Sequence, residues 1–181
     1  MTKKFLFAMF SICLGLTTVF GQPNEAAIAA QRAQIKNLEQ IVGQWQGTGW
    51  IEQGATKYNF AGSENVQKKI DGLALLVEGK FKTKFARNSE EKTIHETLAV
   101  ISFDAKSQKY DFHTFLANGM SGKHELKPTA SGLLWGFDFL NGGIRYLIKI
   151  TGDVWFETGE ISTDDGKTWK KFFEMELRKV K

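Results

Sequence analysis

The sequence predicts an all-β protein, a ten-stranded antiparallel up-and-down barrel with a short N-terminal helix. Apolar and polar residues alternate from about Gln44 to the C-terminus, which is the pattern of half-buried strands. Short turn sequences such as Asp71-Gly72 and Asn118-Gly119 interrupt this alternation, and such steps are typical of hairpins. No stretch after residue 42 is suited to a crossover helix. Consecutive strands therefore pair antiparallel, and closing them into a barrel removes exposed edges, with a sandwich as the alternative.

The breaks in the alternation set the expected strand boundaries. We expect strands at about residues 44–53, 56–70, 73–85, 92–104, 109–117, 121–127, 132–140, 143–151, 153–163 and 168–179. Three parts follow along the chain: a signal peptide over residues 1–21, the N-terminal helix within 22–43 and the β-barrel domain over 44–181.

The first residues have the features of a secretory signal peptide. Lys3 and Lys4 precede an apolar run of about 16 residues, and Val19 and Gly21 are small residues placed for cleavage before Gln22. A membrane anchor is the alternative, but the run is shorter than the roughly 20 residues of a spanning helix. We therefore expect an exported protein, periplasmic or secreted, with no membrane span after cleavage. The mature chain would also lack cysteine, because Cys13 is the only one.

An amphipathic helix is expected after the cleavage site. Asn24 is a suitable N-cap, and Ile28, Ile35, Leu38 and Val42 fall on one face. This stripe predicts a helix that packs on the barrel, with a free partner-binding helix as the alternative.

Composition excludes some classes of function. The chain is 42% hydrophobic and 24% charged, as in a packed globular domain. Without Lys3 and Lys4 it carries 22 Lys and Arg against 20 Asp and Glu, so we expect no nucleic-acid partner.

Alternation also predicts which side chains face the barrel interior, or lumen. Small barrels are filled by side chains or hold one small ligand, and ligand pockets are mostly apolar with a few polar groups. We expect a small apolar ligand, or else a fully packed interior. Glu64 is the one carboxylate placed on these rows, so it favours head groups that donate hydrogen bonds over free acids. The candidate ligand-binding residues are Tyr58, Phe60, Glu64, Val77, Phe81, Trp135, Phe137, Tyr146 and Phe173.

One motif at the start of the strand region resembles a known superfamily. Gly43-Gln44-Trp45, with Arg178 near the end of the last strand, resembles the closure signature of the calycins, which include lipocalins and fatty-acid-binding proteins. The resemblance implies that a basic residue of the last strand packs over Trp45.

The longer pattern is similar to a bacterial family of exported calycin-like domains of uncharacterised function. The matching segments are Val42–Gly49, Glu64 to Gly72 and the terminal Asp165-Gly166 hairpin with Trp169. The opening also resembles the nitrobindins, which bind haem through a histidine of the last strand. Residues 168–179 contain no histidine, so the resemblance implies no such haem ligation here, and we assign no cofactor.

Two further motifs bear on catalysis. Ser162 to Trp169 resembles the Asp-box of sialidases, but a single box in a chain of this length predicts a hairpin and no sialidase. His95, His113 and His124 fall on three successive expected strands and would form a metal site only in a suitable register. We assign no catalytic or metal-binding residue. A metal- or Glu64-dependent barrel enzyme and a packed barrel that binds a protein partner are the alternatives to a ligand-binding barrel.

Overall fold

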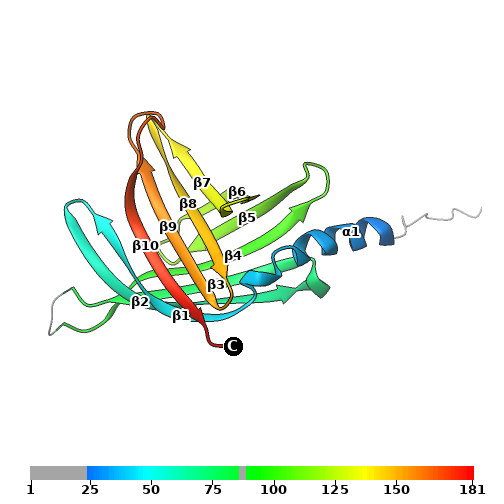
Figure 1. Cartoon of the computed structure of the whole chain (residues 1–181), viewed down its shortest axis with the longest axis horizontal. Coiled ribbons are helices and arrows are strands. Elements are labelled where there is room, and N and C mark those ends of the chain that lie inside the picture. The colour runs from blue at the N-terminus through cyan, green and yellow to red at the C-terminus, as the bar shows by residue number, and fades with distance from the viewer. Residues whose placement is uncertain (1–23, 86–88) are drawn as a thin grey trace, which may run out of the picture.

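The computed structural model describes residues 24–85 and 89–181. In this part of the chain, ten antiparallel strands form one closed barrel (Figure 1). Each strand pairs with its neighbours in sequence, and β1 pairs with β10. The strands are β1 (Gly43–Gln53), β2 (Thr56–Lys69), β3 (Ala74–Thr83), β4 (Lys92–Asp104), β5 (Lys109–Leu116), β6 (Ser121–Thr129), β7 (Gly132–Phe139), β8 (Gly142–Thr151), β9 (Val154–Ser162) and β10 (Lys170–Lys179).

The predicted fold class is confirmed, and the sandwich alternative is wrong. The seam that closes the barrel runs in register from Trp45 opposite Lys179 to Ile51 opposite Phe173. All ten expected strands are present, with ends that differ by a few residues. The expected signal peptide lies outside the described residues.

A helical segment covers one end of the barrel. It consists of α1 (Glu25–Lys36) and the short 3₁₀ turn η1 (Glu39–Ile41). The side chain of Asn24 caps α1 by accepting a hydrogen bond from the backbone N–H of Ala27 at 3.1 Å. Figure 1 shows α1 beside this end of the barrel, which we call the closed end. The expected helix therefore packs on the barrel, although it ends before residue 43.

The last turn of α1 and the residues after it form a plug. Ile35, Leu38 and Ile41 are 1–2% exposed and belong to the same core as the inward side chains of the strands. The indole Nε1 of the fully buried Trp45 donates a hydrogen bond to the carbonyl oxygen of Ile41 at 2.8 Å. The hydroxyl of Tyr110 also donates to the carbonyl oxygen of Gln34, at 2.9 Å. The closed end is thus sealed by apolar packing and by satisfied polar groups.

Strand alternation corrects one detail of the calycin resemblance. Arg178 lies opposite Gln46 on the outer face and pairs with Glu176 at 2.9 Å. Lys179 lies opposite Trp45, and its Nζ is 5.1 Å from the centroid of the Trp45 ring. The cation over the indole therefore comes from Lys179, because only residues on the inward face of β10 can reach Trp45.

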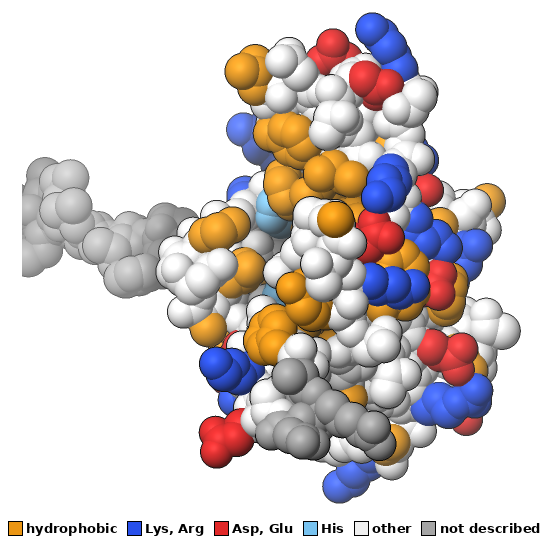
Figure 2. Space-filling model, turned by 90° about the vertical axis from the view of Figure 1, so that its left-hand side faces the viewer, with side chains coloured by type: hydrophobic (Ala, Val, Ile, Leu, Met, Phe, Trp, Pro, Cys, Tyr) orange, Lys and Arg blue, Asp and Glu red, His pale blue; other side chains and the backbone are white. Residues whose placement is uncertain are grey.

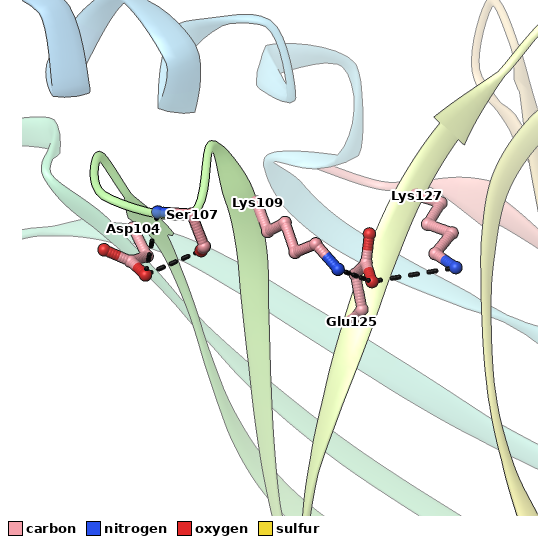
Figure 3. Close-up of polar contacts among 5 residues, drawn as sticks. All are labelled: Asp104, Ser107, Lys109, Glu125 and Lys127. Carbon is pink, nitrogen blue, oxygen red and sulfur yellow. Dashed lines mark hydrogen bonds and ion pairs between the residues drawn. The ribbon is translucent and has the colours of Figure 1, made fainter.

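Polar side chains on the outside of the barrel form hydrogen bonds and ion pairs, as the turn after β4 and the neighbouring strands illustrate (Figure 3). Asp104 accepts hydrogen bonds from the backbone N–H of Lys106 at 3.0 Å and from the hydroxyl of Ser107 at 2.6 Å. Lys109 and Lys127 both contact the carboxylate of Glu125, at 2.8 and 3.6 Å. Exposed pairs of this kind contribute only about 0–1 kcal/mol each, so the stability of the barrel resides in its interior.

Candidate functional site in the barrel lumen

The lumen has two halves that differ in solvent exposure. Near the closed end, the inward side chains are 0–5% exposed, as Trp45, Leu75, Leu133 and Leu177 show. Toward the opposite end, inward aromatic residues such as Trp135 and Tyr146 are only partly buried, and Phe137 is 41% exposed. β6 pairs with β7 only from Lys127 to Thr129, so this exposure comes both from the open end and from the unpaired part of the wall between these two strands. Figure 2 views the molecule from the side away from α1 and shows hydrophobic side chains gathered on that face, with histidine atoms between them.

Glu64 is one of two carboxylates between the two halves. It lies on the inward face of β2, is 9% exposed, and its Oε2 has no hydrogen-bond partner among the described residues. Burial, together with the smaller effect of the Glu157 charge, raises the pKa of Glu64 to about 8.

Gly79 on the neighbouring strand β3 makes room for this carboxyl group. A Cβ at position 79 would lie 2.6 Å from Oε1 and 2.9 Å from Oε2 of Glu64. It would also lie 2.8 Å from Oγ1 of Thr97 on β4. Only glycine leaves this space open, so the local sequence of β3 fixes where the carboxyl group lies.

Glu157 on β9 is the second carboxylate, and the sequence analysis missed it. It is 7% exposed, and its Oε2 accepts a hydrogen bond from Nε1 of Trp155 at 3.1 Å. Burial raises the pKa of Glu157 to about 7, while hydrogen bonds from Trp155 and Trp135 oppose the rise. The charge of Glu157 also reaches Tyr146, whose pKa rises first through burial and then through this charge. Both carboxyl groups therefore gain or lose a proton near neutral pH.

Aromatic rings cover the wall above the carboxylates. Trp135 and Tyr146 stack with ring centroids 4.4 Å apart, and Phe60 stacks on Phe173 at 5.7 Å. The edge of Tyr146 also meets Phe173 at 5.8 Å. Gly159 on β9 permits this approach, because a Cβ there would lie 2.8 Å from the Tyr146 ring. The result is a continuous aromatic surface on β2, β7, β8 and β10.

All nine predicted ligand-binding residues lie on the inward faces of their strands, but at different depths. Four of them line the deep part of the lumen and are 5–9% exposed: Phe60, Glu64, Val77 and Phe81. Four are partly exposed and closer to the open end: Tyr58, Trp135, Tyr146 and Phe173. Phe137 lies at the rim. Whether these residues bind a ligand remains a prediction.

The alternation of residues in β9 does not show whether Glu157 points into the barrel or out of it. Trp155, Glu157 and Gly159 share one face, whereas Phe156 and Glu160 share the other. Each face carries one aromatic residue and one glutamate, so the pattern alone does not show which points inward. The expected strand 56–70 ends one residue too late, because Ile70 lies in the turn η2 (Ile70–Gly72) and is 74% exposed.

The three histidines do not converge. His95 and His124 lie on inward faces, where their rings contact Phe81 and Trp135 with centroids 6.0 and 5.4 Å apart. His113 follows the inward Phe112 and is exposed on the outer face of β5. Within residues 24–85 and 89–181, no three His, Cys, Asp or Glu side chains are grouped so that they could hold a metal ion.

Two hollows of the described structure lie away from the carboxylates. One of about 420 Å³ is beneath the segment after α1, between Asn37, Tyr110 and Ile150. The other, of about 510 Å³, follows the outer wall near Trp50 and Glu174. Neither is lined by Glu64 or Glu157, so the carboxylate pair belongs to the lumen alone.

The closed ten-stranded barrel with a helical plug fits the class of calycin-like barrels. In a comparison with solved structures, the chain is similar to the crystal structure of Rv2717c from M. tuberculosis, with a TM-score of 0.62 and 10% sequence identity. The match covers 81% of this chain and 97% of that one. At this identity the likeness establishes the fold alone. No protein-family model and no curated protein sequence matches the chain. The described residues include no helix that is long and apolar enough to cross a membrane.

Proposed function

We propose that this protein is an exported barrel that binds a small apolar molecule in the open half of its lumen. The observation that carries the proposal is the partial exposure of the inward aromatic side chains in a closed barrel. When an apolar ligand displaces water from apolar side chains in a confined space, the apolar surface leaves water, which is favourable. Pockets of this kind are the usual form of small-molecule sites. The buried Glu64 and Glu157 supply the few polar groups that orient a ligand.

The expected affinity is modest. Burying about 200 Å² of apolar ligand surface contributes about 5 kcal/mol before the cost of association, so binding is micromolar at best. Aromatic rings form most of the wall, and few polar groups are placed to contact a ligand. We therefore expect the site to accept a broad range of apolar ligands.

Export is proposed from the pattern of the first residues, which lie outside the described part of the chain. The basic start, the short apolar run and the Val19 and Gly21 pair favour cleavage before Gln22. N-terminal sequencing of the exported protein is expected to begin at or near Gln22. An intact Met1 in that fraction would contradict the proposal.

A fluorescence titration with an environment-sensitive apolar dye tests lumen binding. We expect wild-type protein to bind the dye and the fluorescence of Trp135 to change, because its ring belongs to the aromatic wall. Phe137→Asp places a charge at the rim and should weaken dye binding about tenfold or more, since the charge must lose water when the dye enters.

Val180→Asp is the matched control. Val180 is 53% exposed beyond the end of β10 and far from the rim, so the same added charge should leave dye binding unchanged. If wild-type protein binds no dye, or if folded Phe137→Asp binds it as well as wild type, the interior is packed and the ligand-binding proposal is wrong.

A further inference from the structure

The polar floor of the open half consists of two acidic side chains that face the same space. Glu64 lies on β2 and Glu157 on β9, and β1 and β10 separate these strands in the barrel. Both side chains point inward, because Glu64 lies in the inward row of β2 opposite Trp45 and Glu157 in the inward row of β9 opposite Met175. Their electrostatic contact is visible in the effect of the Glu157 charge on Glu64.

The described residues leave this pair without a cation. Each ion pair of the described chain involves other carboxylates, such as Glu96 with Lys80 and Glu160 with Arg145. Glu157 accepts hydrogen bonds from neutral indole N–H groups, and Oε2 of Glu64 accepts none. A buried carboxylate without a charged partner or a full set of hydrogen bonds is costly, so the arrangement favours a ligand that provides both.

The surroundings restrict the chemistry of such a ligand. The stacked rings of Trp135 and Tyr146 form an apolar wall beside the pair, and the side chain of Trp135 donates a hydrogen bond to Glu157. A primary ammonium group carries one positive charge and three N–H donors, whereas an alcohol has no charge and a quaternary ammonium has no donor. A free carboxylate would be repelled by the pair.

We infer that the lumen selects a primary amine with an apolar body, whose ammonium group is held between Glu64 and Glu157. This inference rests on the lumen-binding function proposed above and adds the chemistry of the ligand's polar end. The ammonium donates to Oε2 of Glu64 and to the carboxylate of Glu157, and the apolar body lies along the aromatic wall.

Binding of the amine is coupled to release of protons. At neutral pH the free pair holds about one proton, because burial raises the pKa of Glu64 to about 8 and that of Glu157 to about 7. An ammonium between them favours the ionised form of both, so affinity increases from pH 5.5 to pH 8. Other titratable side chains on the inward faces of the described strands include Tyr58, His95, Tyr110, His124, Tyr146 and Lys179, together with Lys68, whose Nζ pairs with Glu39 at 2.7 Å.

Titration calorimetry with four octyl compounds tests the inference. The probes are octylamine, octan-1-ol, octanoate and trimethyloctylammonium, which share one apolar body. For wild-type protein at pH 7.5 we expect octylamine to bind about tenfold more tightly than octan-1-ol, as expected for charge-assisted hydrogen bonds. Trimethyloctylammonium should bind more weakly than octylamine, because it has no N–H for Oε2 of Glu64. Titrations in buffers of different ionisation enthalpy should show release of about one proton per octylamine.

Glu64→Gln keeps the shape of the side chain and removes its charge. We expect this variant to lose the preference for octylamine and the proton release while it still binds octan-1-ol. Glu78→Gln is the matched control, because Glu78 lies on the outer face of β3 beside Gly79 and accepts from Asn65 and Gln67. That variant should behave like wild type.

The outcomes separate the two proposals. If wild-type protein binds octan-1-ol and octylamine equally, or if Glu64→Gln keeps the preference, the amine inference is overturned and lumen binding stands. If wild-type protein binds none of the octyl compounds and no apolar dye, the proposed function itself is overturned.

Discussion

Glu64 shows what one acidic residue costs when it is buried among apolar neighbours. Its carboxyl group is 9% exposed, with one oxygen unpartnered in the described structure, and its pKa is raised to about 8. The ordinary pKa of a glutamate is 4.5. Between these values the folded protein binds the proton more tightly than the unfolded chain does. The contribution of Glu64 to stability is therefore fully present below the unfolded pKa and is lost as the pH rises toward 8.

We predict that Glu64→Gln stabilises the protein at high pH. The pKa of Glu64 is raised to about 8. A shift of about 3.5 pKa units corresponds to about 5 kcal/mol at full ionisation, and relaxation of the site makes this an upper limit. Urea unfolding at pH 9 should show the variant to be more stable than wild type by a large part of this amount, whereas the difference should shrink at pH 5. Glu78→Gln serves as the control. Equal stability at both pH values would mean that Glu64 is hydrated in solution.

Gly79 is the second residue on which the site depends. A Cβ there would come within 2.6 Å of Glu64 and 2.8 Å of Thr97, both on neighbouring strands. We predict that Gly79→Ala displaces the carboxyl group and destabilises the fold by about 1–3 kcal/mol, the usual cost of overpacking. The same change at Gly54, which has no atom within 4 Å of its Cβ position but has a φ of +64°, tests backbone strain alone. A Gly79→Ala variant with wild-type stability and an unchanged pKa of Glu64 would show that the carboxyl group lies elsewhere.

At the scale of the elements, the segment after α1 determines which end of the barrel is closed. Leu38 is 1% exposed and touches the inward core of the strands. We predict that Leu38→Ala costs about 2–5 kcal/mol, because it removes buried methyl groups and leaves a cavity. Leu140 lies in the β7–β8 turn and is 89% exposed, so Leu140→Ala should change stability little. Chemical denaturation measures the free energy of unfolding of both variants. Similar costs would indicate that the helical segment does not seal the barrel in solution.

The β9–β10 hairpin is stabilised by one aspartate. Asp164 accepts from the backbone N–H and the hydroxyl of Thr168 at 2.8 and 2.6 Å, and from the hydroxyl of Ser162 at 2.8 Å. These hydrogen bonds, that from the Thr168 side chain foremost, lower the pKa of Asp164. We predict that Asp164→Ala lowers the melting temperature at neutral pH. A carboxyl group with a lowered pKa stabilises the folded protein only while it is ionised. The difference in melting temperature between wild type and Asp164→Ala should therefore diminish as the pH falls through the pKa of Asp164. If the difference in melting temperature did not depend on pH, the loss of stability would come from the turn propensity of residue 164 and not from its charge. The hairpin is the structure expected from the Asp-box pattern.

At the scale of the whole molecule, the barrel is packed at one end and open at the other. Trp45 is fully buried near the closed end, whereas Phe137 is 41% exposed at the rim. Local opening is easiest where few apolar contacts hold the backbone. We predict that amides of β1 and β10 near Trp45 and Leu177 exchange with solvent about one to two orders of magnitude more slowly than those near Phe137. Hydrogen exchange followed by mass spectrometry measures this. Uniform protection along the strands would indicate an interior packed at both ends.

The architecture of the barrel follows from local sequence patterns. Strand alternation and turn residues such as Asp71-Gly72 act over a few neighbouring residues, so ten strands and their inward faces could be predicted. The same local rule placed Glu64 and eight apolar or aromatic residues inside. Strand alternation failed where both faces of a strand look alike, as in β9. It also did not show which basic residue at the end of β10 lies over Trp45.

Which inward residues meet depends on how the whole chain folds. Glu64 and Glu157 are 93 positions apart in the chain, and their encounter depends on barrel closure and on the register of three strand pairs. The depth of each ring likewise depends on the plug formed by Leu38 and Ile41. Periodicity reports the direction of a side chain but carries no information about its height along the barrel axis or its partner across the lumen. For that physical reason the acidic pair, on which the proposed chemistry depends, is a property of the closed fold.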